Sequence, residues 1–586
     1  MFSAFRRLIL LPVAAILALP LHSALVAAPD AGVPSKNGIV VCTSAPACDV
    51  GASILAKGGT AVDAAVATAF ALAVTHPSAG NIGGGGFMVV RSPNGKATAF
   101  DYREKAPLKS TRTMYLRDGK VDISLTNEGY LAPGVPGTVR GLALAHKRFG
   151  KLPWKDVVMP AVQLAEEGFA ISAGLARGLN SQLAGTMGKY PASVEAYGKP
   201  GGGTWAADDR LVLKDLGRTL RAIATDGPDV FYKGWIADRI AEDMAAHGGL
   251  ITKEDLAAYE AKERAPVTGT FRGYQIVAMP PPSSGGVALI EMLNILEGFD
   301  LHAKGSSSPE AVHLVVEAMR RAYLDRARFL GDPDFVQIPV ARLMSKEHAK
   351  EVRATIDPAK ASSSAELGQD ILLQPQTVEP DETTQFSIVD RAGMAVSNTY
   401  TLEGGYGSRV VVKGAGFILN NEMGDFNKNP GVTDEHGTIG TPANLIDPGK
   451  RMLSSMTPAI VTRNGKVVLV TGSPGGRTII NTVLCVVLNA TEFRMNVRDA
   501  VDAPRLDHEW MPDTVRLERV GTDSGLVDAL QKMGHIGVTT GGAQGDANSI
   551  AIDAGGTAWG AADTKRSADG KASPAGPRLT STAPRK

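Results

Sequence analysis

The segment Asp381-Glu-Thr-Thr-Gln-Phe-Ser-Ile-Val-Asp390 lies about two-thirds of the way along a chain of 586 residues. At this point a polar stretch gives way to a run that is typical of a β-strand. Cleavage of the peptide bond before Thr383 would give that residue a free α-amine beside its own hydroxyl group. One residue would then carry both a nucleophile and a base, so the pair Thr383-Thr384 is the first candidate for chemistry in this chain.

The sequence on either side of this segment predicts a layered α/β body. Residues 150–350 are mostly helical in pattern, and the chain after Thr384 is enriched in β-branched residues. The predicted helices are 49–57, 60–74, 154–167, 211–224, 238–246, 310–329, 478–489 and 526–533. The predicted strands are 38–41, 269–279, 386–390, 395–402, 410–412 and 460–470. Two polar segments, a connector at about 355–382 and a tail at about 566–586, are expected to be poorly structured.

The first 28 residues are predicted to be an export signal. Arg6 and Arg7 precede an apolar run at 8–21, and the small residues at 24–28 suit a signal peptidase. An uncleaved membrane anchor is the alternative. However, the apolar run is shorter than the ~20 residues that a span needs, and two prolines interrupt it. We therefore expect a periplasmic or secreted protein without a stable membrane anchor.

The net charge argues against one class of partner, and the cysteines indicate one possible disulfide. The chain has 61 basic and 60 acidic side chains, so its net charge of +1 gives no electrostatic case for binding nucleic acid. Cys42 and Cys48 could form a small-loop disulfide in an oxidising compartment, or they could remain free thiols. Cys485 lies in an apolar run and is expected to be a buried packing residue. No group of residues has metal-ligand spacing in the sequence.

Several short segments could serve a threonine nucleophile. The glycines of Thr471-Gly-Ser-Pro-Gly-Gly476 end a strand before a helix, where backbone N–H groups can face developing negative charge. A tight turn without a ligand is the alternative. The run Gly83 to Gly86 lacks the Lys-Ser/Thr of a phosphate-binding loop, so close backbone packing is the better interpretation.

Three other segments offer polar side chains, each with a simpler explanation. Arg103 in Asp101-Tyr-Arg-Glu104 could grip a carboxylate, or it could be a surface arginine. Asn420-Asn-Glu-Met-Gly-Asp-Phe426 offers amides and carboxylates, or is a loop stabilised by its own side chains. Leu453-Ser-Ser-Met456 offers two hydroxyls, or caps the edge of a strand.

Together these segments resemble the γ-glutamyltranspeptidases (glutathione hydrolases) of the N-terminal-nucleophile hydrolase superfamily. The resemblance covers about 38–563 and also includes Gly58-Gly-Thr-Ala-Val-Asp-Ala-Ala65 and the stretch from His76 to Met88. It implies an α/β (α+β) fold, specifically a four-layer αββα sandwich. It also implies a large subunit at 29–382, a small subunit at 383–586 that together form a heterodimer, and no cofactor or metal.

The resemblance also implies a role for each matching residue. Thr383 is expected to cut the chain after Glu382 and then to act as the nucleophile, supported by the hydroxyl of Thr401. Gly475 and Gly476 are expected to form the oxyanion hole. The expected anchors for the substrate's α-carboxylate are Arg103, Ser454 and Ser455. The expected anchors for its α-ammonium are Glu403, Glu422 and Asp425.

The implied activity is ping-pong transfer of a γ-glutamyl group from glutathione or a related donor to water or to an amino acid or dipeptide. Gln385 stands where many members have His, Glu403 where many have Asn, and His436 where a lid-loop Tyr is common. Two other hypotheses remain open. One is an acylase of the same fold for glutaryl-type β-lactam side chains. The other is an unprocessed, non-catalytic periplasmic binding or scaffold protein.

Overall fold

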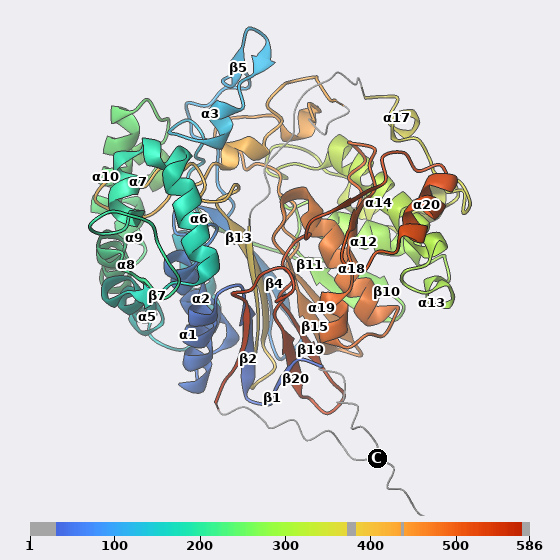
Figure 1. The fold of residues 1–586 in the computed structure, drawn as a ribbon, viewed down its shortest axis with the longest axis horizontal. Helices are drawn as coiled ribbons and strands as arrows, with labels where there is room; N and C mark the ends of the chain where they lie inside the picture. The colour runs from blue at the N-terminus through green and yellow to red at the C-terminus, as the bar shows by residue number, and fades with distance from the viewer. Residues whose placement is uncertain (1–30, 372–382, 435–438, 577–586) are drawn as a thin grey trace, which may run out of the picture. The chain divides into compact units, whose positions relative to one another are not determined.

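Two seven-stranded antiparallel sheets lie face to face, and a layer of helices covers the outer face of each (Figure 1). The computed structural model describes residues 31–371, 383–434 and 439–576. The strand orders are β1-β20-β19-β15-β14-β11-β10 in the first sheet and β21-β2-β12-β13-β3-β4-β9 in the second. This arrangement confirms the predicted α/β (α+β) class and the four-layer αββα sandwich.

The strands of both sheets come from distant parts of the chain. Those of the first sheet are β1 (Val33–Ser35), β20 (Ala558–Ala561), β19 (Ser549–Ile552), β15 (Lys466–Thr471), β14 (Ala459–Arg463), β11 (Tyr274–Ala278) and β10 (Val267–Phe271). Those of the second are β21 (Lys571–Pro574), β2 (Gly38–Cys42), β12 (Thr384–Asp390), β13 (Ala395–Thr401), β3 (Gly85–Arg91), β4 (Ala97–Asp101) and β9 (Lys262–Arg264). Short strands pair outside the sandwich: β5 (Leu116–Arg117) with β6 (Lys120–Val121), β7 (Phe169–Ala170) with β8 (Arg210–Leu211), and β17 (Arg516–Glu518) with β16 (Leu506–Asp507) and β18 (Thr539–Gly541).

Each helical layer combines helices that pack on one sheet with helices that pack on those helices. The layer on the second sheet is built around α1 (Ala45–Ala56), α2 (Ala61–Thr75), α4 (Thr138–Phe149), α5 (Trp154–Glu167), α6 (Ala173–Ala184), α8 (Lys214–Asp226) and α10 (Trp235–Ala246). The layer on the first sheet is built around α12 (Gly285–Leu296), α14 (Pro309–Phe329), α16 (Lys346–Arg353), α18 (Ile479–Thr491), α19 (Val497–Asp502) and α20 (Ser524–Lys532).

Strand β2 shows why the second sheet is buried on both faces. Val40 and Cys42 pack into the core beneath α1 and α2, whereas Ile39 and Val41 pack into the core between the two sheets. Successive side chains of a strand point to opposite faces, so both faces of this sheet need apolar residues. All five residues of β2 are accordingly buried.

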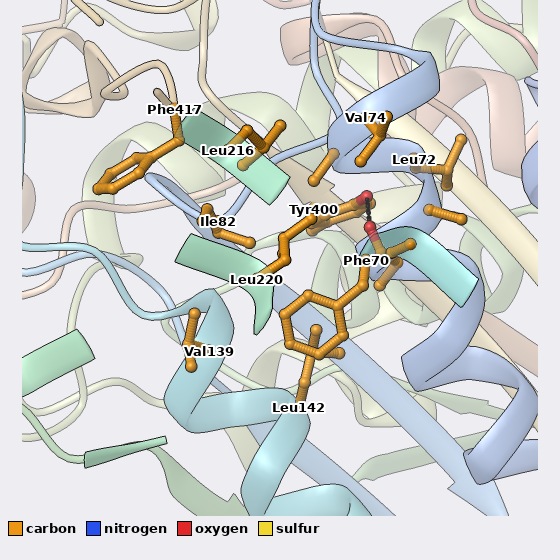
Figure 2. Packing of buried hydrophobic residues seen from close by; sticks show 14 of the residues in the cluster. Phe70, Leu72, Val74, Ile82, Val139, Leu142, Leu216, Leu220, Tyr400 and Phe417 are labelled. Carbon is orange, nitrogen blue, oxygen red and sulfur yellow. Dashed lines mark hydrogen bonds between the residues drawn. The ribbon is translucent and has the colours of Figure 1, made fainter. Parts of the chain in front are cut away.

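The core beneath the helices also anchors strand β13. Figure 2 shows Tyr400 of β13 among Phe70, Leu142 and Leu220, which come from three helices. The Tyr400 hydroxyl donates a hydrogen bond to the backbone carbonyl of Ala69 at 2.9 Å, so its polar end is satisfied although it is buried. This packing fixes the strand position directly before Thr401.

The structure confirms most predicted helices and corrects two strands. The helices predicted at 154–167, 310–329 and 60–74 are α5, α14 and α2, and a capping box of Thr60 and Asp63 begins α2. The single strands predicted at 269–279 and 460–470 were wrong, since each is a hairpin that turns at Arg272-Gly273 or Asn464-Gly465. All four turn residues have positive φ, as tight hairpin turns require. Within 410–412 only Val411 pairs, in an isolated bridge with Ile418.

Parts of the predicted connector and tail are ordered, which corrects those two predictions. Ser364 is buried, begins the short helix α17 (Ser364–Leu367), and accepts a hydrogen bond from Trp510 Nε1 at 2.8 Å. In the tail, Lys571–Pro574 forms β21 and pairs with β2. The ordered part of the connector contacts the buried Trp510, and β21 pairs with β2 at the edge of the second sheet. The polar composition of both segments gave no sign of these contacts.

Several predictions concern residues that the structure does not describe. The signal peptide at 1–28, Glu382, His436 and the remainders of the connector and tail lie outside the described residues. Within the described residues, no helix is long and apolar enough to cross a membrane. Cys42 and Cys48 are joined in a disulfide, and Cys485 is free and buried as predicted.

Candidate active site

Thr383 and Thr401 lie together at one end of the central strands β12 and β13. Thr383 directly precedes β12, and Thr401 is the last residue of the neighbouring antiparallel strand. The Thr383 hydroxyl donates a hydrogen bond to Thr401 Oγ1 at 3.3 Å. The backbone N–H of Glu403 donates to the same oxygen at 2.7 Å. Thr401 therefore supplies an oxygen acceptor of fixed position for the hydroxyl of Thr383.

The glycine run 83–86 holds this end of β13 in place. A Cβ atom on Gly84 would lie 2.1 Å from the carbonyl oxygen of Thr401, and one on Gly83 would lie 2.1 Å from that of Ile418. Asn81 Nδ2 also donates to the Thr401 carbonyl, at 2.8 Å. The prediction of close backbone packing is thereby confirmed, and the run supports Thr401.

One cavity brings most of the predicted site residues together. Its wall includes Thr383, Thr401, Arg103, Glu403, Glu422, Asp425, Ser454, Ser455 and Gly476. Gly475 lines a neighbouring cavity, which also reaches Thr383. The two cavities therefore meet at Thr383.

Arg103 is a buried member of this wall, so the alternative of a surface arginine is wrong. Its side chain is 1% exposed, and its Nη1 lies 2.6 Å from Glu422 Oε2. Its Nη2 pairs with Asp425. The guanidinium also donates to the carbonyls of Met452 and Leu453, each at 3.3 Å. The predicted anchors for a carboxylate and for an ammonium are thus in direct contact with one another.

The carboxyl groups around Arg103 do not all carry a charge at neutral pH. Burial raises the pKa of Glu104 to about 8, although Arg103 opposes this shift. Burial also raises the pKa of Glu422 well above its ordinary value, and the nearby Glu104 and Asp425 carboxylates add to the effect. Burial opposes the charge of Arg103, but these carboxylates raise its pKa above the ordinary value. The site therefore combines a guanidinium group that stays charged with carboxyl groups whose protonation can change near neutral pH.

The serine pair is held by the turn before α12. Ser454 N–H donates to the carbonyl of Pro282 at 3.0 Å, and Ser284 N–H donates to the carbonyl of Ser454 at 2.7 Å. Ser454 and Ser455 are 2% and 7% exposed. The pair is therefore part of a rigid wall, and both residues border the cavity.

The predicted strand-to-helix turn at Gly475 and Gly476 is confirmed. It connects β15 to a short 3-10 turn (Gly476–Thr478) and then to α18. Gly475 and Gly476 have φ angles of 127° and 53°, which disfavour residues with a Cβ atom. The turn brings Gly476 to the wall of the cavity that contains Thr383.

The second threonine of the pair has a different environment. Thr384 is fully buried, and its Oγ1 lies 3.2 Å from Thr43 Oγ1. Gln385 is also buried. Its Nε2 donates to Ser397 Oγ at 3.2 Å, and its Oε1 accepts from Thr399 Oγ1 at 2.5 Å. Glutamine is thus accommodated by hydrogen bonds at the position where many family members have histidine.

Two arginines of the cavity wall were not predicted from the sequence. Arg326 is one of four arginines on α14, and no pattern in that helix distinguishes it from the others. Arg477 donates to the carbonyls of Glu509 and Met511 at 3.0 and 2.9 Å. Arg477 could have been predicted as a site residue, because it directly follows Gly475-Gly476 in the sequence.

Among the described residues, two groups of side chains could hold a metal, and neither group borders this cavity. These buried groups are His313, Glu317 and His535, and Glu291, Asp325 and His348. Within them, His313 Nδ1 lies 2.8 Å from His535 Nε2, and His348 Nε2 lies 2.9 Å from Asp325 Oδ2. These hydrogen bonds account for the burial of the side chains they join.

Comparisons with known proteins agree with this geometry. The family model described as gamma-glutamyltranspeptidase matches residues 47–573. The chain is 46% identical over 534 residues to the glutathione hydrolase proenzyme of Escherichia coli (strain K12), and the match covers 91% of each protein. It is 38% identical over 535 residues to the acylase ACY 1 proenzyme of Pseudomonas sp. (strain SE83), covering 90% of this chain and 92% of that protein. The crystal structure of cephalosporin acylase from Bacillus halodurans matches with a TM-score of 0.80 at 26% identity, covering 95% of this chain and 99% of that one. The chain therefore belongs to the γ-glutamyltranspeptidase family.

Proposed function

We propose that this protein is an autoprocessed γ-glutamyltransferase and glutathione hydrolase that uses Thr383 as its nucleophile. The observation that carries the proposal is a single cavity in which Thr383 and Thr401 lie with the ion pair of the buried Arg103 and the partly exposed Asp425. The name of the Escherichia coli relative, glutathione hydrolase proenzyme, supports both the activity and the need for processing.

Processing begins when Thr383 Oγ1 attacks the carbonyl carbon of Glu382. The C–N bond breaks, and the nitrogen takes the bond's electron pair and the hydroxyl proton. This shift frees the α-amine of Thr383 and leaves an ester between Glu382 and Thr383 Oγ1. Water hydrolyses the ester to a carboxylate on Glu382 and the free hydroxyl of Thr383. The products are a large subunit at 29–382 and a small subunit at 383–586, which form a heterodimer. Removal of residues 1–28 during export belongs to the same proposal.

In turnover the new α-amine of Thr383 serves as the base. Its ordinary pKa of about 7.7–8.0 leaves part of it neutral near neutral pH, so it can accept the hydroxyl proton. Oγ1 attacks the γ-carbonyl of glutathione, and the N–H groups of Gly475 and Gly476 stabilise the oxyanion. Cysteinylglycine leaves with a proton on its amine. Water or an acceptor amino acid or dipeptide then takes the γ-glutamyl group from the ester.

The polar wall of the cavity suits the free end of a γ-glutamyl group, which is a zwitterion. Its α-carboxylate is assigned to Arg103, Ser454 and Ser455, and its α-ammonium to Glu403, Glu422 and Asp425. Opposite charges lie side by side in the cavity wall, as they do in such a ligand. The proposal needs no cofactor.

A second candidate is a glutaryl-type β-lactam acylase, favoured by the 38% identity to an acylase proenzyme. A glutaryl group has no α-ammonium, so binding it would bury the carboxylates near Arg103 without a partner from the ligand. The carboxylates of Glu422 and Asp425 therefore favour the γ-glutamyl donor.

The test compares two anilides, L-γ-glutamyl-p-nitroanilide and glutaryl-p-nitroanilide, on the cleaved protein. We expect kcat/KM to be at least about 100-fold higher for the γ-glutamyl compound, because several charged hydrogen bonds depend on the ammonium group. A preference for the glutaryl compound would support the acylase. Binding of the γ-glutamyl compound by cleaved protein without turnover would support the non-catalytic hypothesis.

A further inference from the structure

The hydrogen bonds of the serine pair determine what each hydroxyl can offer to a ligand. The backbone N–H of Met456 donates to Ser454 Oγ at 3.1 Å, and Arg326 Nη2 donates to Ser455 Oγ at 3.0 Å. A serine hydroxyl has one proton, and here both oxygens act as acceptors toward N–H groups. Each hydroxyl can therefore use its own proton to donate to an anion in the adjoining cavity.

Arg326 contacts both Ser455 and the serine that holds the backbone of Ser454. Besides its bond to Ser455, its Nε donates to Ser284 Oγ at 2.9 Å. Ser284 Oγ in turn donates to the backbone carbonyl of Ser454 at 2.7 Å. A guanidinium group has donors only, so the bond to Ser455 cannot reverse its direction. One planar group thus fixes the orientation of Ser455 and supports the backbone of Ser454.

Charge gives Arg326 a second effect on Ser455. Arg103, the predicted carboxylate anchor, is already in contact with Glu422 and Asp425, so part of its hydrogen-bonding capacity is occupied. A hydrogen bond from a cation polarises the hydroxyl that accepts it and makes that hydroxyl a better donor. Arg326 also borders the cavity itself. The serine side of the cavity therefore gains positive character from α14.

We propose that Arg326 is a positioning residue that orients Ser455 to bind the α-carboxylate of the substrate. The inference rests on the proposed function, because it requires a γ-glutamyl ligand. It assigns part of substrate recognition to a helix that lies more than one hundred residues before the serine pair in the chain. Arginine suits this role better than lysine, since only a fork of donors can reach Ser284 and Ser455 together.

The experiment measures competitive inhibition by L-glutamate and by 4-aminobutyrate, which is the same chain without the α-carboxylate. We expect Arg326→Ala to raise the Ki of L-glutamate about 10- to 100-fold and that of 4-aminobutyrate less than about 3-fold. Arg326→Lys should recover only part of the loss. The matched control is Arg328→Ala on the same helix, whose side chain contacts Asp370 and the Leu367 carbonyl, and it should change both Ki values less than about 2-fold.

A double-mutant cycle tests whether Arg326 acts through Ser455. In a Ser455→Ala background, Arg326→Ala should raise the Ki of L-glutamate by less than about 3-fold more. Fully additive effects, equal weakening of both inhibitors, or an unchanged Ki for L-glutamate would overturn the inference. Intact mass will report whether each variant is cleaved, and Arg326→Lys serves if the alanine variant does not fold.

The failure of this inference and the failure of the proposed function give different results. If the wild-type protein binds 4-aminobutyrate as tightly as L-glutamate, or does not turn over the γ-glutamyl anilide, the proposed function is wrong. If the wild-type protein prefers L-glutamate and Arg326→Ala keeps that preference, only the role of Arg326 is wrong.

Discussion

Thr401 Oγ1 is the hydrogen-bond acceptor for the hydroxyl of Thr383, and its own position is fixed by the N–H of Glu403. We expect Thr401→Ala to slow both self-cleavage and kcat about 10- to 100-fold, because the nucleophile loses an oriented hydrogen bond. Thr401→Ser keeps the oxygen and should remain within a few-fold of wild type. Denaturing gels over time and initial rates measure the two effects. Cleavage of Thr401→Ala at the wild-type rate would contradict this role.

Individual site residues could be predicted from the sequence where the neighbouring residues form a recognisable motif, and were missed where they do not. Thr383 was identifiable from its position before a strand and from the family resemblance. Arg326 was not, because it reaches Ser455 only after α14 packs on the sheet. The ion pairs of Arg103 were also not predictable from spacing, since Glu422 and Asp425 lie more than three hundred residues away.

Gly84, directly before β3, approaches the end of β13 so closely that a Cβ atom would lie 2.1 Å from the Thr401 carbonyl oxygen. We expect Gly84→Ala to cost about 1–3 kcal/mol of unfolding free energy and to lower the cleaved fraction, because Thr401 must shift. Gly525→Ala in α20 is the control. A Cβ atom on Gly525 would lie 3.7 Å from its nearest neighbouring atom, so this substitution should leave the unfolding free energy unchanged or slightly higher. Wild-type cleavage and kcat in Gly84→Ala would show that this contact does not position Thr401.

Glu291 in helix α12 and Glu297, which caps the C-terminus of that helix, have opposite pKa shifts. Burial, with a contribution from Asp325, raises the pKa of Glu291 from 4.5 to about 8. The folded protein therefore binds more protons than the unfolded chain between these values, and its stability falls as the pH rises through them. Glu291→Gln removes this loss. We expect its Tm to improve relative to wild type by roughly 2–4 °C between pH 5 and pH 8.5.

Glu297, at the end of the same helix, provides the matched control. Burial opposes its charge, but hydrogen bonds from Lys346 and Arg272 lower its pKa below the ordinary value. Its contribution to stability is present above pH 4.5 and is lost as the pH falls through the lowered pKa. Glu297→Gln should therefore fall further behind wild type as the pH rises toward 6. Calorimetry of the wild type and both variants at these pH values measures the Tm. A difference in Tm from the wild type that stays constant with pH for both variants would contradict the assigned pKa shifts.

Element boundaries show where sequence patterns fail. Helix α5 was predictable from its helical pattern, and α14 also from the N-cap and first-turn pair Ser308-Pro309. The two hairpins were read as single strands because their turns are only two residues long, although Asn464-Gly465 is a recognised hairpin signal. The ordered strand β21 was missed because its pairing with β2 is a contact between the two ends of the chain.

Both sheets combine strands from before and after the bond between residues 382 and 383. In the second sheet β2 lies between β21 and β12, and β3 pairs with β13. In the first sheet β1 pairs with β20, and β11 pairs with β14. We expect the cleaved fragments to elute as one species in native size-exclusion chromatography and to separate only in denaturant. Two native peaks after cleavage would contradict this expectation.

The sandwich as a whole was predictable from the family resemblance but not from element patterns alone. Alternation of helices and strands indicates layers, yet it does not say which distant strands pair. That information lies in contacts such as those of β12, which inserts between β2 and β13 and places Thr383 at the end of the sheet.

Intact mass spectrometry of the purified wild-type protein and of Thr383→Ala tests the role of Thr383 most directly. We expect two fragments from the wild type, the smaller beginning at Thr383, and one uncleaved chain from the variant. A wild-type chain that stays whole, or a small fragment that begins at Thr384 or elsewhere, would contradict the assignment of Thr383 as the residue that cuts the chain and then carries the γ-glutamyl group.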